Sequence, residues 1–199
     1  MAGNLVVFDN YDSFTYNLVH YLENLTGKRP KVVLNDDPHW ERCLEADALV
    51  LSPGPGLPNE SGALMSLIKK WDQKKPLLGI CLGMQALGQL EGEELESLAH
   101  PAHGVAHSVH CLTSDALFNE IETQFAAGRY HSWGFFNMVS GKYQPLAKTE
   151  DGCIMAIKHR KNPWYGLQFH PESIMTPAGM RLLHNWLNLS GIPNTYSHS

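Results

Sequence analysis

Apolar positions along this chain form short continuous runs that alternate with segments of helical periodicity. The runs at residues 5–8, 31–34 and 46–51 end in polar or glycine-rich stretches, as expected for strands buried on both faces. Between the first two runs, apolar side chains recur at helical spacing over residues 14–25, and Gly27 follows as a candidate C-cap. This alternation predicts a parallel sheet covered by helices on both faces.

The second half of the chain changes character after another strand and helix. An apolar run at residues 77–80 leads into a helical pattern at 82–90. Residues 93–157 then contain mainly strand-like fragments, which we interpret as antiparallel strands added to the parallel sheet. An extended run over residues 164–169 precedes a last helix at 178–189. Ligands of such sheets bind at the carboxyl ends of the strands.

Length and composition limit the classes of function. The 199 residues suit one domain, which we expect over residues 1–192 with a flexible tail at 193–199. A net charge of −5 argues against nucleic acid or an anionic membrane surface as a partner. We expect neither a membrane span nor a signal peptide, and therefore a cytoplasmic protein. The four cysteines are widely spaced and suggest neither a disulfide framework nor a zinc site.

Cys81 is the strongest candidate for a reactive side chain. It interrupts an apolar run, lies between Gly79 and Gly83, and precedes a helix, which predicts a sharp strand-to-helix turn. The free amides and partial positive charge of the first helical turn would favour a thiolate. A buried cysteine more often serves only as a small core residue. The turn and a distant candidate base favour the reactive interpretation.

His170 is that candidate base. It ends an extended run, and Pro171 favours continued extension, so His170 and Glu172 would project to the same side. A carboxylate there can accept the Nδ1 proton and direct Nε2 toward a nucleophile. The alternative is an unrelated surface pair. Together with Cys81, the residues predict a Cys–His–Glu triad.

A thiolate that attacks an acyl carbon also needs donors for the developing oxyanion, worth on the order of 3 kcal/mol each. The amide of Leu82, directly after the nucleophile, is one candidate. The loop at residues 52–56 offers another, because its prolines remove competing amides and its glycines allow close approach. We expect the Gly56 amide to be this donor, although the loop alone could be an ordinary turn.

These segments together resemble the class I, triad-type glutamine amidotransferases. Four motifs match that family in its order: residues 52–56, 79–85, 129–132 and 168–173. The opening residues 8–17 are similar more narrowly to the glutaminase subunits of anthranilate synthase and 4-amino-4-deoxychorismate synthase. The resemblance covers nearly the whole chain. It implies an α/β, flavodoxin-like, mostly parallel sheet with helices on both faces and a small appended antiparallel sheet.

The resemblance implies hydrolysis of L-glutamine to glutamate and ammonia through a thioester on Cys81. It also implies that ammonia passes to a chorismate-binding synthase subunit on a separate chain, without a cofactor. The resemblance implies that the 54–56 loop, Gln85, and the backbone of Ser132 and Trp133 bind the substrate. The substrate-binding positions carried over are Gly54, Pro55, Gly56, Gln85, Ser132 and Trp133.

Two other functions and one metal hypothesis compete with this interpretation. A stand-alone thiol hydrolase of γ-glutamyl substrates could use the same scaffold, although the 8–17 motif suits an interface better. A binding protein without activity is disfavoured by the intact triad. Four histidines within residues 100–110 could suggest a metal site on a helix. Pro101 and Gly104 argue against that helix, so we expect no metal.

Overall fold

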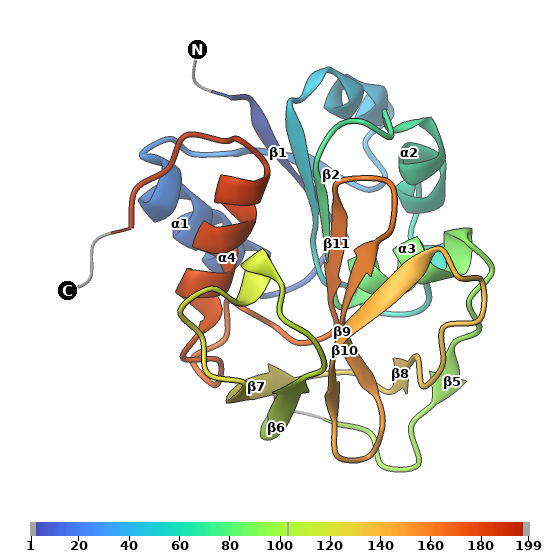
Figure 1. The fold of residues 1–199 in the computed structure, drawn as a ribbon. Helices are drawn as coiled ribbons and strands as arrows, with labels where there is room; N and C mark the ends of the chain where they lie inside the picture. Colours follow the sequence, from blue (N-terminus) through green and yellow to red (C-terminus); the bar gives the residue numbers. More distant parts are fainter. Residues whose placement is uncertain (1–2, 103, 197–199) are drawn as a thin grey trace.

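The computed structural model describes residues 3–102 and 104–196. Within them, one continuous sheet has nine strands (Figure 1). Its parallel half runs in the order β2 (Lys31–Leu34), β1 (Leu5–Asp9), β3 (Ala48–Leu51), β4 (Leu77–Ile80) and β11 (Trp164–Leu167). Its antiparallel half continues with β10 (Ile154–His159), β9 (Tyr143–Thr149), β6 (Val105–Cys111) and β7 (Gln124–Arg129).

Helices cover both faces of the parallel half (Figure 1). One face carries α1 (Thr15–Thr26) and α4 (Gly179–Leu189), and the other carries α2 (Leu64–Lys70) and α3 (Leu82–Leu90). Because neighbouring strand residues point to opposite faces, Val7 packs in the cluster with α1 and α4, whereas Val6 and Phe8 pack in the cluster with α2 and α3. The predicted α/β architecture is confirmed, and continuous apolar strands result from burial on two sides.

The carboxyl ends of the parallel strands meet at one edge of the sheet. Register pairs Ile80 with Leu167, so Cys81 and Gln168 leave neighbouring strands at the same level. The loop after β3 begins at Ser52, whose amide donates to the Phe8 carbonyl at the end of β1. This edge therefore gathers three of the predicted motifs, as expected for ligand sites of parallel sheets.

The antiparallel region differs most from the sequence-based predictions. Strand β9 was not predicted, because Pro145 interrupts its pattern; the register shift between β9 and β10 falls beside that proline. A second, two-stranded sheet pairs β5 (Glu96–Ser97) with β8 (Trp133–Gly134). Three short 3₁₀ helices complete the secondary structure of the described residues: Trp40–Glu45, Pro58–Glu60 and Ala116–Phe118.

The histidine-rich segment forms no helix in the described residues. His107 and His110 lie in strand β6, three positions apart and hence on opposite faces, while His103 falls outside the described residues.

Near the carboxyl end, the Thr195 amide donates to the Leu25 carbonyl at 2.8 Å. The domain boundary at residue 192 stays a prediction. Every helix described is too short or too polar to cross a membrane.

Candidate active site

Cys81 sits on a strained turn between β4 and α3. Its backbone angles, φ 51° and ψ −104°, lie in a region of backbone conformation that residues other than glycine rarely adopt. The turn is close-packed, since a Cβ on Gly79 would lie 2.5 Å from the Gly83 carbonyl carbon, and one on Gly83 would lie 2.7 Å from the Leu51 carbonyl oxygen. The predicted strand–turn–helix is confirmed, and the two glycines are sterically required.

His170 and Glu172 form a buried pair in the segment after β11. Nδ1 of His170 lies 2.7 Å from Oε1 of Glu172, and both residues are 2% exposed. The Tyr130 ring packs on the imidazole with centroids 4.8 Å apart, and Phe14 contacts it at 6.0 Å. Nε2 of His170 is buried and makes no hydrogen bond to the described residues. It is therefore the ring atom available to a reacting group.

The charges around the imidazole favour its protonated form. Burial alone would lower the pKa of His170, but the neighbouring Cys81 sulfur and the Glu172 carboxylate together raise that pKa to about 10. The imidazole is thus cationic at neutral pH, beside the sulfur. An imidazolium at this position can donate its Nε2 proton to a reacting group.

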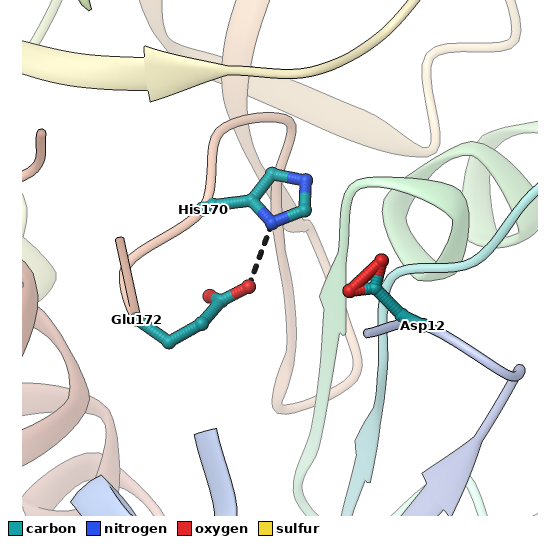
Figure 2. Close-up of side chains that lie close together, drawn as sticks. All are labelled: Asp12, His170 and Glu172. Atoms are coloured by element: carbon teal, nitrogen blue, oxygen red, sulfur yellow. Dashed lines mark hydrogen bonds and ion pairs between the residues drawn. The ribbon is translucent and has the colours of Figure 1, made fainter. Parts of the chain in front are cut away.

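Asp12 also lies beside this pair, although we did not predict it as a site residue. Figure 2 shows its carboxylate directed toward His170 and Glu172 from the loop after β1. Potential ligand atoms of the three residues lie within 4.8 Å of one another, and one Asp12 oxygen accepts the Phe14 amide proton at 2.9 Å. No sequence pattern joins Asp12 to residues about 160 positions later. The His170–Glu172 hydrogen bond already uses Nδ1, which leaves a metal ion no site there without breaking that bond.

Two glutamine side chains connect Cys81 to the Trp133 carbonyl on the opposite wall of the cavity. Nε2 of Gln168 donates to the Cys81 sulfur at 3.6 Å, and Oε1 of Gln168 accepts from Nε2 of Gln85 at 3.2 Å. The second Gln85 proton is donated to the Trp133 carbonyl oxygen at 2.9 Å. Gln85 therefore lies one turn beyond Cys81 on the same side of α3, as the spacing predicted.

A cavity of about 400 Å³ opens above the sulfur. Its walls come from the 52–57 loop, α3 and the segment after β7, and they include all six positions predicted to bind substrate. The lining residues are Gly54, Pro55, Gly56, Leu57, Glu60, Cys81, Gln85, Tyr130, His131, Ser132 and Trp133. Leu82, the other predicted oxyanion donor, follows Cys81 at the buried start of α3 and is not among them.

Gly54 and Gly56 are glycines for two different reasons. A Cβ on Gly54 would lie 2.6 Å from Asn10, so the loop can approach the end of β1 only without a side chain. Gly56 has φ +74°, in the left-handed region that favours glycine. These contacts hold the loop beside the nucleophile, where the oxyanion prediction requires it.

Comparison with known proteins identifies the family. The family profile described as "Glutamine amidotransferase class-I" matches residues 6–189. The chain belongs to this family. Among solved structures, this amidotransferase resembles a Thermoplasma acidophilum protein described as a putative component of GMP synthase. The TM-score is 0.85 over 96% of this chain and 95% of that one, at 24% identity. That likeness concerns the fold alone.

Curated relatives of this amidotransferase are more similar in sequence. Anthranilate synthase component 2 of Lactococcus lactis is 42% identical over 187 residues, covering 92% of this chain and 93% of the relative. Aminodeoxychorismate synthase of Streptomyces griseus is 40% identical over 93% of this chain, which spans only 26% of that protein. Anthranilate synthase component 2 of Thermus thermophilus is 37% identical, with 92% and 91% covered.

Sequence reasoning missed several residues that surround the amidotransferase site. Gln168 and Tyr130 each lie inside one of the four motifs, but neither was assigned a role. Arg129 and His131, from the same motif as Tyr130, are both buried; His131 lines the cavity and Arg129 lies behind it. Their placement in a motif was the one available signal, since their contacts depend on how distant strands pair.

Proposed function

We propose that this chain hydrolyses L-glutamine through a thioester on Cys81. The sulfur attacks the side-chain amide carbon, and the amides of Gly56 and Leu82 stabilise the oxyanion. Protonated His170 donates its proton to the departing nitrogen, and ammonia leaves. The neutral imidazole then takes a proton from water, which attacks the thioester and releases glutamate. Glu172 holds the imidazole in the required tautomer and orientation.

The observation that carries this proposal is the meeting of three features at one cavity. The strained Cys81 and the predicted substrate-binding positions line the cavity. The buried His170–Glu172 pair, almost ninety residues later in the chain, lies beside Cys81 behind that lining. The cavity suits a ligand of glutamine size, since its volume lies within the usual range for small-molecule sites. Gly54 and Pro55, on one wall, and Ser132 and Trp133, on the other, would hold the amino-acid end of glutamine.

We further propose that the ammonia serves a separate, cytoplasmic synthase subunit that binds chorismate. Relatives named anthranilate synthase component 2 and aminodeoxychorismate synthase support such a partner. The ring chemistry would belong to that subunit, so the product is either anthranilate or aminodeoxychorismate.

The decisive test is Cys81→Ala in complex with the candidate partner. We expect loss of glutamine-dependent synthesis, while synthesis from added ammonia continues, because only the ammonia source is removed. Cys111→Ala, at a half-buried cysteine outside the cavity, is the matched control and should retain glutamine use. Continued use of glutamine by Cys81→Ala would refute the assignment.

Assay of each partner with chorismate and glutamine then identifies the amine product. A chain that cleaved γ-glutamyl peptides but supplied no ammonia to any partner would instead be the stand-alone hydrolase. A glutamine-like electrophile should label Cys81, and labelling confined to Cys43, Cys111 or Cys153 would contradict the proposed nucleophile.

A further inference from the structure

Arg129 is a buried cation beneath the wall of the cavity. It ends strand β7, and its side chain is 1% exposed. Nη1 donates to Asp151 at 3.2 Å, and Nε donates to Nε2 of His131 at 3.1 Å. A guanidinium removed from water is stable only where an opposite charge balances it and its N–H groups make hydrogen bonds. Asp151 balances the charge, which leaves the contact with His131 to be explained.

The contact with Arg129 determines the tautomer of His131. A guanidinium can only donate, so Nε2 of His131 must accept, and the ring proton must lie on Nδ1. Nδ1 in turn lies 2.8 Å from the Trp133 carbonyl oxygen, which can only accept. Burial, with the nearby Arg129 charge, lowers the pKa of His131 to about 4, which keeps the ring neutral at physiological pH.

The same carbonyl determines the orientation of Gln85. Because the Trp133 oxygen accepts, the Gln85 atom 2.9 Å from it must be the amide nitrogen. The second proton on that nitrogen is donated to Gln168. Both Gln85 donors are therefore occupied within the protein, and its Oε1 acceptor is the group left for a ligand in the cavity.

We propose that Arg129 and His131 are positioning residues that hold the Trp133 carbonyl against Gln85. With that carbonyl in place, the Gln85 amide nitrogen faces it and Oε1 is presented as an acceptor, which suits the α-ammonium group of the substrate. This inference rests on the proposed function, because it assumes free glutamine as the ligand. The two residues act on substrate binding and leave the nucleophile and its base unchanged.

The test compares His131→Leu with His131→Asn in the complex with the synthase partner. The leucine variant removes the donor to Trp133, so KM for glutamine should rise about tenfold with little change in kcat. Asparagine can still donate, and should restore part of the affinity. Iodoacetamide should alkylate Cys81 at the wild-type rate in both variants, since the triad is untouched.

Selectivity between glutamine and an analogue without the α-amino group provides a second measurement, because a general loss of structure would lower the hydrolysis of both substrates equally. Glutaramate lacks the α-amino group, so its hydrolysis should fall far less than that of glutamine in His131→Leu. His159→Leu is the matched control, because His159 is also a buried histidine but lies outside the cavity lining. It should leave both substrates unaffected.

A measurement on the wild type guards against variants that fail to fold. The ¹⁵N shifts of His131 should show the neutral Nδ1–H tautomer at pH 7, and the Nε2–H tautomer would overturn the inference. If the wild type is active and His131→Leu has an unchanged KM and unchanged selectivity, the positioning role is overturned while the proposed function stands. A wild-type complex that hydrolysed no glutamine would overturn the proposed function as well.

Discussion

Backbone strain at Cys81 should be measurable as a free energy of unfolding. A residue with a Cβ at φ 51° and ψ −104° costs about 1–3 kcal/mol relative to glycine at such positions. Cys81→Gly should release this strain, whereas Cys81→Ala should retain it. Compared with Cys81→Ala, the glycine variant also loses about 0.5–1 kcal/mol of stability through the higher entropy of the unfolded chain. It loses about 0.8 kcal/mol more because the buried Cβ is missing. We therefore expect the two variants to have nearly equal stability.

A matched pair separates the strain from these other costs. Ala86 is buried in α3, one turn further along, where the backbone is helical. Ala86→Gly in the Cys81→Ala background carries the same two costs without strain release, so it should lose about 1–2 kcal/mol. The difference between the two alanine-to-glycine changes measures the strain, about 1–3 kcal/mol.

Urea unfolding at pH 7, followed by tryptophan fluorescence, gives both differences when the m values agree. Equal losses at positions 81 and 86 would refute the strained turn. Stored strain would then play no part in holding the sulfur above the sheet, and the packing of Gly79 and Gly83 alone would have to do so.

Three further predictions concern the triad, the loop and pH. Glu172→Gln should lower kcat for glutamine by about 10⁴-fold. The alkaline limit of activity should move below the His170 pKa of about 10, because a negative charge beside the imidazole is removed; an unchanged pH profile would contradict this. Gly54→Ala should reduce glutaminase turnover at least tenfold because its Cβ would strike Asn10 at 2.6 Å, as initial rates would show. The His131 pKa is lowered to about 4 in the folded protein, so as the pH falls His131 is protonated in the unfolded chain before it is protonated in the folded one. The free energy of unfolding should therefore fall by roughly 3 kcal/mol between pH 6.5 and 4, and urea titrations of His131→Asn should show a shallower fall.

Much of the site could be predicted because its signals are local. The elbow at Cys81 needs only an apolar strand, two small residues and a following helix, which all lie within eleven positions. His170 and Glu172 are two residues apart, so extended backbone alone brings them to the same side. Glycine at 54 and 56 likewise reports a backbone constraint that no other residue meets easily.

The antiparallel half was less predictable because strand pairing there depends on distant partners. Strand β9 contains Pro145 and an irregular apolar pattern, and it becomes a strand because β10 and β6 pair with it on either side. The short β8 is similar, since Trp133–Gly134 has too few residues for a periodic signal.

The sequence by itself determined the layered α/β architecture and predicted Cys81 and His170 as nucleophile and base, because burial patterns and turn chemistry act between near neighbours. Only the tertiary structure decided how Asp12 meets His170, how Gln168 reaches the sulfur, and how Arg129 and His131 connect to the Trp133 carbonyl that Gln85 faces. Those contacts join side chains from separate strands and loops, and their hydrogen-bond directions follow from geometry at distances of about 3 Å, which no periodicity along the chain encodes.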